Sequence, residues 1–378
     1  MKDEGRDPSS LRPSSVRLLL IGGGHSHLFV LEDFARRPPA GVELIVVAPS
    51  PLATYSGMVP GVLGGQYQLR AAQIDVRRLV ERAGGRFVAA RVTALDPRQR
   101  SLVLDDGSRV PYALASFDIG SRTAPLPTDP GAPLVAIKPM EPAIAALDAV
   151  LASRPGARAV VIGAGAAGCE IALALAARLR RGGGAVTVCD RAARPLPEFA
   201  PRAAVLIERA FADAGVTWLA ERTVSTLAAD GVRFTDGTLV PAELIVTAAG
   251  AVGGELFAEA GLAVDERGFL LVDETLRCRG YPEIFAAGDC ATLAARRALP
   301  KSGVYAVRQG PLLAANLRAA LRAVPLQPFR PQPRALALLN TADGRAIATY
   351  GALAAHGRWA MRLKDWIDRR FIRRFDQG

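Results

Sequence analysis

The strongest constraint on the fold of this chain is a unit of strand, glycine turn, helix and strand that occurs twice. Each copy consists of two short apolar runs that flank a glycine turn, at residues 16–21, 22–27 and 42–48 and again at 159–162, 163–168 and 185–189. Short apolar runs bounded by glycine are typical of buried parallel strands, each followed by a helix. Two copies about 140 residues apart predict two dinucleotide-binding folds in one chain.

The second glycine turn, GAGAAG, keeps all three glycines of a dinucleotide-binding turn: Gly163, Gly165 and Gly168. Asp190 ends the next apolar run, where an acid binds the adenosine ribose hydroxyls and repels a 2′-phosphate. This pattern predicts a nicotinamide dinucleotide site that prefers NADH, although Arg191 and Arg194 leave NADPH open.

The first glycine turn, GGGHSH, is a weaker match. Gly22, Gly23 and Gly24 suit a tight turn and a close approach to a pyrophosphate, but His27 stands where the third glycine is expected. We therefore expect the helix to lie further from the strand or to start differently. The usual acid after the second strand is also missing, and Ser50 is the candidate for a ribose contact.

His25 and His27 lie two residues apart in this turn and raise the question of a metal. No third ligand is nearby, so we expect helix capping or packing for both, with His25 a candidate to contact the cofactor. The four cysteines have no zinc or disulfide spacing, which favours buried thiols in a reduced, cytoplasmic protein. No metal site is predicted.

Composition excludes several other classes. The net charge is +11, but the 43 Arg are spread along the chain and aromatic residues make up 6%, so nucleic-acid binding is not predicted. No apolar stretch reaches 18 residues, so no membrane-spanning helix is expected. Residues 1–15 have no apolar core of a secretion signal, and we expect a disordered tail there.

Further segments complete a recognisable order of motifs. DIGS (Asp118 to Ser121), TAAG (Thr247 to Gly250) and EIFAAGDC (Glu283 to Cys290) accompany the two glycine turns. Together they resemble the flavoproteins with two dinucleotide-binding domains, the pyridine nucleotide-disulfide oxidoreductase superfamily. YSGMVPG and KSGVYAVRQG resemble type II NADH dehydrogenases, and GGGHSH with RLKDWIDRRFIRRF resembles bacterial oxidoreductases associated with selenophosphate synthetase.

The resemblance implies an α/β fold with two three-layer Rossmann-like domains, the NAD(P)H domain inserted in the FAD domain. It gives an FAD domain at 16–125 and 251–325, an NAD(P)H domain at 126–250, and a small C-terminal α+β segment at 326–378. Within the FAD motifs it implies cofactor contacts for Gly120, Gly288 and Asp289, with Asp289 on the ribityl chain. In the NAD(P)H domain the resemblance implies a cofactor contact for Gly250.

The resemblance also implies the reaction: hydride passes from NADH to FAD, and electrons then pass to an acceptor, which we expect to be a quinone. Glu170 is then a candidate to orient the nicotinamide, or only a favourable acid at a helix N-terminus. Lys301, before the helix that faces the flavin in that superfamily, is a candidate to stabilise negative charge on the flavin, or only a surface lysine. The alternatives are oxidation of sulfide or a selenium compound, and a non-catalytic FAD/NAD sensor that acts through a partner such as selenophosphate synthetase.

The C-terminal segment from Trp359 combines apolar and basic residues at helical spacing. Seven Arg and Lys residues occupy much of its surface. The apolar residues share one face of a helix: Trp359, Leu363, Trp366, Ile367, Phe371 and Phe375. Such a helix can lie in a membrane interface, or its aromatic face can dock on the protein or on a second copy. This leaves open a peripheral location on the inner face of the cell membrane, and a homodimer.

Overall fold

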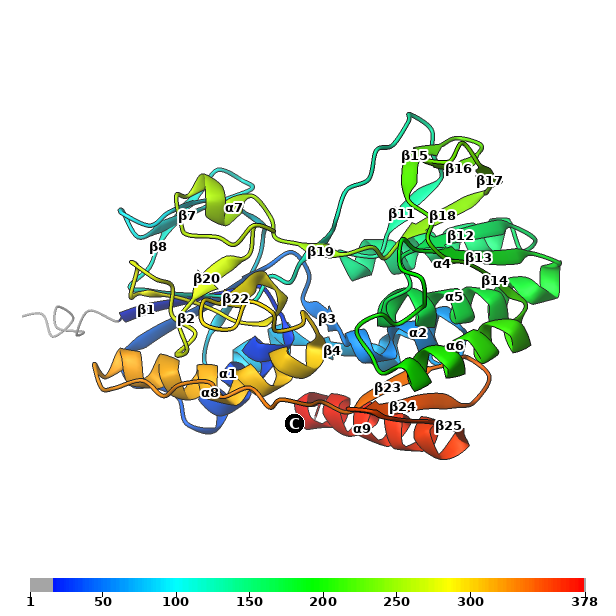
Figure 1. Cartoon of the computed structure of the whole chain (residues 1–378). Coiled ribbons are helices and arrows are strands. Elements are labelled where there is room, and N and C mark those ends of the chain that lie inside the picture. The colour runs from blue at the N-terminus through cyan, green and yellow to red at the C-terminus, as the bar shows by residue number, and fades with distance from the viewer. Residues whose placement is uncertain (1–15, 377–378) are drawn as a thin grey trace, which may run out of the picture. The chain divides into compact units, whose positions relative to one another are not determined.

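The structure, a computed structural model, describes residues 16–376 of the chain, so the expected N-terminal tail lies outside the described residues. The described residues form two compact units (Figure 1). Unit 1 contains the residues up to Ala53, with Asp75–Gly120 and Gly254–Arg330, and unit 2 contains Thr54–Ile74, Ser121–Gly253 and the residues from Pro331. This division differs from the expected domain boundaries because residues 54–74 and the C-terminal segment both pack in unit 2.

Unit 1 is built on a parallel five-stranded sheet. Its strand order is β21 (Ile284–Ala286), β9 (Leu114–Phe117), β1 (Val16–Ile21), β2 (Val42–Ala48) and β5 (Arg86–Ala89). Leu18, Leu19 and Leu20 of β1 are fully buried, as expected for a central strand covered on both faces. The sequence neighbours β1 and β2 pair directly, and β9 adds on the other side of β1, so the strand order reverses at β1.

Helices and smaller sheets complete unit 1. The principal helices are α1 (His25–Arg36), α3 (Val76–Arg82) and α8 (Gly303–Leu321), with a short α7 (Leu256–Glu259). Ser26 Oγ of α1 donates a 2.9 Å hydrogen bond to the carbonyl oxygen of Ala306 in α8. The short alternating runs within Arg91–Asp118 predict a β-meander, which is confirmed as β6 (Val92–Asp96), β7 (Ser101–Leu104) and β8 (Arg109–Pro111). In addition, β20 (Leu270–Val272) pairs with β22 (Ala291–Leu293).

Unit 2 contains a second parallel five-stranded sheet. Its order is β11 (Leu134–Ala136), β18 (Leu244–Thr247), β12 (Arg158–Ile162), β13 (Ala185–Cys189) and β14 (Val216–Leu219). One face packs against helices α2 (Val59–Leu63), α4 (Met140–Ser153), α5 (Ala166–Leu179) and α6 (Pro201–Ala214). The other face packs against an antiparallel sheet of β15 (Val224–Ala228), β16 (Gly231–Phe234) and β17 (Leu239–Pro241).

Successive residues of a strand in this sheet point to opposite faces and so belong to different cores. In β12, Val161 belongs to the core on the helix side, whereas Val160 and Ile162 belong to the core under β15–β17. Because both faces are covered, the strand reads as an unbroken apolar run rather than as alternating residues. The predicted α/β class with two three-layer units is therefore confirmed. Short pairs β3 (Leu52–Thr54) with β4 (Gln73–Asp75) and β10 (Arg122–Thr123) with β19 (Ala251–Val252) complete the strands.

The C-terminal part of unit 2 is an antiparallel sheet covered by one helix. The sheet contains β23 (Ala337–Asn340), β24 (Ala346–Tyr350) and β25 (Leu353–Gly357), and α9 (Arg358–Asp376) lies along it (Figure 1). Ala346 and Ala348 face Ala360 of α9, whereas Ile347 faces the core of the parallel sheet. The apolar runs Ala335–Leu339 and Ala346–Tyr350 predict two of these strands, and the helix is expected, but β25 is not predicted.

The predicted apolar face of α9 is only partly correct. Phe375 is buried, but Trp359 and Trp366 are 54% and 57% exposed. The buried side is instead completed by Ala360, Lys364 and Asp368. Lys364 can be buried because its Nζ donates hydrogen bonds to the carbonyl oxygen of Gly57 at 2.6 Å and to Asp368 at 2.8 Å.

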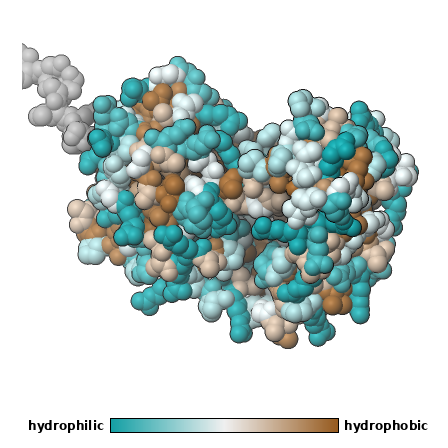
Figure 2. All heavy atoms as spheres, turned by 45° about the horizontal axis from the view of Figure 1, so that its top comes forward, coloured by the Kyte–Doolittle hydropathy of each residue, from teal (hydrophilic) through white to brown (hydrophobic). Residues whose placement is uncertain are grey.

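No helix within residues 16–376 is both long enough and apolar enough to cross a bilayer. On the face of the molecule shown in Figure 2, hydrophobic residues lie in small groups scattered among hydrophilic ones.

Candidate dinucleotide and redox sites

The first glycine turn of unit 1 follows β1 and leads into α1. Gly22 has φ +94°, and a Cβ on it would lie 2.3 Å from the carbonyl oxygen of Asp118, so only glycine fits. A Cβ on Gly24 would lie 2.2 Å from Cγ of Asp118. The turn thus brings the N-terminus of α1 against the end of β9, which leaves backbone and helix N–H groups at the strand ends, as in a phosphate-binding turn.

His27 explains why the third glycine is dispensable in this turn. Its Nδ1 lies 2.7 Å from the carbonyl oxygen of Gly22 and its Nε2 lies 2.9 Å from Ser116 Oγ. The ring is fully buried, and burial lowers the pKa of His27 to about 4, so the imidazole is neutral. The ring therefore connects the start of α1 to β1 and β9, which confirms packing for His27; both ring nitrogens are engaged and unavailable to a metal.

The other predicted FAD residues lie at the same edge of the sheet in unit 1. Ser50 follows β2, Gly120 follows β9, and Gly288 and Asp289 follow β21. These are carboxyl ends of neighbouring parallel strands, where ligands of such sheets bind. Ser50 makes a local turn: its Oγ donates to the carbonyl oxygen of Leu52 and accepts from the Leu52 N–H, each at 3.0 Å.

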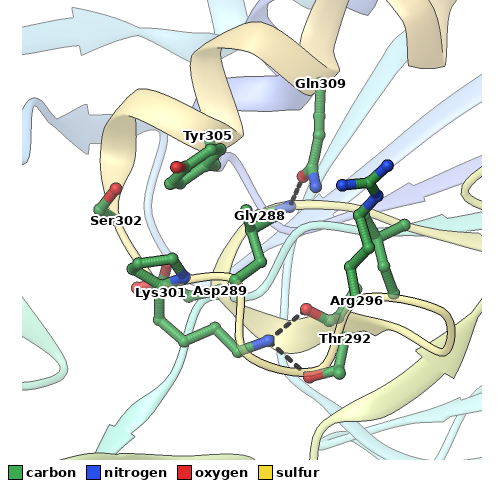
Figure 3. A pocket seen from close by; sticks show the side chains of 12 residues that line it. Gly288, Asp289, Thr292, Arg296, Lys301, Ser302, Tyr305 and Gln309 are labelled. Atoms are coloured by element: carbon green, nitrogen blue, oxygen red, sulfur yellow. Dashed lines mark hydrogen bonds between the residues drawn. The ribbon is translucent and has the colours of Figure 1, made fainter. Parts of the chain in front are cut away.

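A pocket lies where η5 (Gly288–Cys290), β22 and the start of α8 meet (Figure 3). Residues that line it include Gly288, Asp289, Thr292, Lys301, Tyr305 and Gln309. Gln309 Oε1 accepts a 2.7 Å hydrogen bond from the Gly288 N–H, which ties the glycine turn to α8. The structure therefore brings Lys301 and Asp289 to one pocket.

Lys301 does not point freely into this pocket. Its Nζ donates to Thr292 Oγ1 at 2.8 Å and also to the carbonyl oxygen of Ala291 (Figure 3), and it lies 4.0 Å from the centre of the Phe269 ring. Burial lowers the pKa of Lys301 to about 8, and the negative charges of Asp265 and Asp289 oppose this effect. The lysine is therefore not a surface residue; it holds positive charge inside the wall of the pocket.

The second glycine turn, in unit 2, matches its prediction closely. Gly163 has φ +105°, and a Cβ on Gly168 would lie 1.8 Å from the carbonyl oxygen of Gly163, so the helix can approach the strand only with glycine there. Asp190 directly follows β13, and its carboxylate accepts from the Ala164 N–H at 2.7 Å and from the Ala192 N–H at 2.9 Å. Asp190 therefore holds the glycine turn in place through these two hydrogen bonds, and it lies at the carboxyl end of β13.

A carboxylate of the chain lies at the N-terminus of α5. Gly165 is the N-cap, and the N–H of Ala166 donates a 3.2 Å hydrogen bond to Glu198 Oε1. Glu198 is exposed and belongs to the loop before α6. Gly250, the remaining predicted residue of this site, follows β18, and its carbonyl oxygen accepts from the Ala124 N–H at 3.3 Å.

Glu170, on α5, lies in a buried polar cluster with the C-terminal segment. Its Oε1 accepts a 2.7 Å hydrogen bond from the Asn340 N–H. Burial raises the pKa of Glu170 to about 7, although Lys364 opposes this effect. Around Lys364 and Asp368, Tyr55 stacks on Phe371 at 4.4 Å between ring centres, so residues 54–74 and α9 enclose the cluster together.

All four cysteines in the described range are free and buried. Cys290, which follows Asp289, has its Sγ 3.2 Å from the carbonyl oxygen of Ala287, and burial raises the pKa of this thiol to about 12. A protonated, enclosed thiol is a poor nucleophile. The expectation that the cysteines serve packing is therefore confirmed.

Sequence reasoning missed several residues of these sites. Asp118 is 4% exposed beneath the first glycine turn; it belongs to the DIGS motif, but sequence reasoning assigned it no role of its own. Glu198 and Gln309 have no local signal because their partners are backbone N–H groups distant in sequence. Lys364 and Asp368 could be suspected from their spacing of four residues, which suits an ion pair on a helix.

Comparison with known proteins identifies the family. Residues 16–310 match the model of the pyridine nucleotide-disulphide oxidoreductase family. The chain belongs to this family. It is accordingly an oxidoreductase that depends on FAD and NAD(P)H.

Relatives of this oxidoreductase include NADH dehydrogenase-like proteins. One from Mycobacterium tuberculosis is 30% identical over 309 residues, which cover 73% of each chain. The demethylphylloquinone reductase of Synechocystis is 25% identical over 362 residues, 89% of this chain and 87% of its own.

Solved structures show the same fold. The sulfide:quinone oxidoreductase of Aquifex aeolicus superposes with a TM-score of 0.79 at 18% identity and covers 96% of this chain and 92% of its own. The water-forming NADH oxidase of Lactobacillus brevis superposes with a TM-score of 0.74 at 22% identity, over 88% of this chain and 75% of its own.

Proposed function

We propose that this oxidoreductase transfers electrons from NADH to a quinone. FAD held in unit 1 would supply the hydride- and electron-transfer chemistry. The observation that carries the proposal is the absence of a reactive thiol among the described residues, since all four cysteines are enclosed. Without a redox-active cysteine pair the electrons have to leave through a diffusible carrier or a partner protein.

The relatives favour a quinone as that carrier. The demethylphylloquinone reductase is similar to this chain over most of both lengths, and the Mycobacterium protein is named for NADH dehydrogenase. A ferredoxin-type acceptor is the alternative, because the putidaredoxin reductase of Pseudomonas putida is 31% identical, although over 53% of this chain. Sulfide oxidation is disfavoured, since the likeness to a sulfide:quinone oxidoreductase is one of fold and the Cys290 thiol is enclosed.

The residues of the chain have separate tasks in this proposal. Gly22–Gly24, Gly120, Gly288 and Asp289 hold FAD in unit 1, with His25 and Ser50 as further contacts. In unit 2, Gly163, Gly165, Gly168, Asp190 and Gly250 hold the nicotinamide dinucleotide, and Asp190 selects NADH. Glu170 orients the nicotinamide, and Lys301 supplies positive charge near the flavin when it becomes reduced.

The exposed side of α9 supports contact with a membrane that contains the quinone. Trp359 and Trp366 are more than half exposed, and they share the exposed side with six arginines: Arg358, Arg362, Arg369, Arg370, Arg373 and Arg374. Tryptophan suits the boundary between headgroups and acyl chains, and arginine suits anionic headgroups. Docking of α9 on its own unit uses the opposite side, so both roles expected for this helix are compatible. Selenophosphate synthetase as a partner and a homodimer remain predictions.

A stopped-flow experiment tests the function. The oxidised protein is mixed anaerobically with NADH, NADPH or sulfide, and flavin absorbance is followed. We expect rapid bleaching with NADH, slower bleaching with NADPH and none with sulfide. The reduced protein is then mixed with a short-chain quinone or with a [2Fe–2S] ferredoxin. Recovery of absorbance with quinone supports the proposal; bleaching by sulfide alone, or recovery with ferredoxin alone, would contradict it.

A further inference from the structure

The carboxyl group of Asp118 lies between two glycine-containing segments of the proposed FAD site, the first glycine turn at Gly24 and the turn at Gly288. It directly follows β9 and is 4% exposed. A Cβ on Gly24 would lie 2.2 Å from its Cγ, and a Cβ on Gly288 would lie 2.5 Å from its Oδ1. Both turns therefore need glycine partly because this acid occupies the space between them.

Asp118 also uses the N–H groups that begin α1. Its Oδ2 accepts from the Ser26 N–H at 2.7 Å and from the His27 N–H at 3.2 Å. The N-terminus of a helix after a glycine turn is where a dinucleotide pyrophosphate binds, because free N–H groups and the helix dipole favour an anion. The cofactor phosphates and the Asp118 carboxyl therefore share one helix end.

The surroundings of Asp118 do little to stabilise its negative charge. Burial raises the pKa of Asp118 to about 7, the hydrogen bonds from His27 and Ser26 oppose this effect, and the charge of Asp289 adds to it. The nearby Cys290 thiol is protonated and the His27 ring is neutral. The charge of Lys301 opposes the rise in the Cys290 pKa, and Asp289 in turn raises the pKa of Lys301. The Lys301 ammonium donates its hydrogen bonds to the Ala291 carbonyl oxygen and to Thr292. His25, the first residue of α1, is the other titratable side chain at this helix end.

We propose that Asp118 makes FAD binding proton-linked: its carboxyl takes up a proton from solvent as FAD binds and releases it as FAD leaves. The proposal rests on the FAD site proposed above. The physical reason is repulsion between like charges. Two phosphate charges brought to the same buried helix end disfavour the carboxylate strongly, whereas the protonated acid carries no charge and can donate a hydrogen bond.

The sign of the pH dependence follows from this linkage. Below the pKa of Asp118 in the free protein, the acid is protonated with or without FAD, so binding takes up no proton. Above it, the free protein carries the carboxylate and binding requires a proton. The dissociation constant for FAD should therefore be constant below about pH 6.5 and rise toward a limit of about tenfold per pH unit above pH 7.5.

Isothermal titration of the apoprotein with FAD measures the proton directly. At pH 8, titrations in two buffers with different ionisation enthalpies give the number of protons taken up. We expect a large fraction of one proton for the wild type, little for Asp118→Asn, and a value near the wild type for His25→Gln. Asn keeps the shape and can accept from the Ser26 and His27 N–H groups, so this variant should still bind FAD.

The possible results distinguish a failure of the proposed role of Asp118 from a failure of the proposed FAD site. Equal proton uptake in the wild type and Asp118→Asn, or loss of uptake in His25→Gln, would overturn the role of Asp118 while the FAD site stands. No binding of FAD by the wild type would overturn the FAD site itself. If Asp118→Asn does not fold, infrared difference spectra of the wild type decide: a carboxylic-acid C=O band that appears when FAD binds at pH 8 supports the proposal, and its absence overturns it.

Discussion

The N–H of Ala166 donates a 3.2 Å hydrogen bond to Oε1 of Glu198, so a side-chain carboxylate of the chain lies at the helix end where a dinucleotide pyrophosphate is expected. Glu198 is exposed and can swing away, but its charge still repels an incoming phosphate. We expect Glu198→Gln to bind NADH about two- to fivefold more tightly at low salt, with a smaller gain at high salt. Fluorescence titration measures this effect. Glu208→Gln, which removes an exposed acid from α6, is the control, and an equal gain there would contradict the local explanation.

Asp190 gives the second prediction, which concerns the choice of nicotinamide cofactor. Its two carboxylate oxygens accept from the Ala164 and Ala192 N–H groups, and a carboxylate at this position can also accept from the ribose hydroxyls of NADH but repels the 2′-phosphate of NADPH. The wild type should prefer NADH, and Asp190→Ser should weaken NADH binding and narrow the preference. Steady-state kinetics with both donors measures this. A wild type that prefers NADPH would instead assign the 2′-phosphate to Arg191 or Arg194.

Lys301 gives the third prediction. A positive charge held in the pocket wall stabilises the added negative charge of a reduced flavin, so Lys301→Met should lower the flavin midpoint potential and slow reduction by NADH, with FAD still bound. Potentiometric titration measures this. Because Lys301 also bonds to Ala291 and Thr292, the variant should lose thermal stability as well. An unchanged potential with lower stability would limit Lys301 to that structural role, and Lys301→Arg should restore the potential if charge is the cause.

Glu170 gives the fourth prediction, a pH dependence of stability. A carboxyl whose pKa is raised by burial contributes its stability at low pH and loses it as pH rises through the folded-state pKa, here about 7. The melting temperature of unit 2 should therefore fall between about pH 4.5, the ordinary pKa of a glutamate, and pH 7, and level off above that, and Glu170→Gln should make this fall shallower by a few degrees. Scanning calorimetry across this range measures both. Asp118 titrates in the same range in unit 1, so the comparison needs an Asp118→Asn background.

The exposed tryptophans of α9 give the fifth prediction. Double replacement of Trp359 and Trp366 by Ser should reduce binding to phosphatidylglycerol vesicles several-fold without unfolding the protein, since both rings are more than half exposed. Vesicle co-sedimentation measures this, and high salt should weaken the wild type because the arginines contribute. Val205→Ser, which changes an exposed apolar residue on α6, is the control. Unchanged binding of the double variant would limit α9 to its docking role.

The sequence predicted the parts of the fold that are set by local rules. Gly163 and Gly168 could be identified because the close approach of helix and strand admits no Cβ, and the buried strands because both of their faces are covered. By contrast, β25 was missed because GALAAHG carries no apolar alternation; it becomes a strand by pairing with β24. The aromatic stripe of α9 was only partly correct, because the ion pair of Lys364 with Asp368 and the Gly57 carbonyl group allow a charged side chain to occupy a buried position.

The chain changes between units 1 and 2 five times, and this has a consequence for how it can be synthesised and folded. The parallel sheet of unit 1 gains its edge strand β21 only from residues 284–286, and unit 2 gains β23–β25 and α9 only from the last part of the chain. On a translating ribosome neither core can therefore close before most of the polypeptide has emerged. Truncated nascent chains should expose apolar surface to chaperones for longer than in a protein whose first domain is continuous.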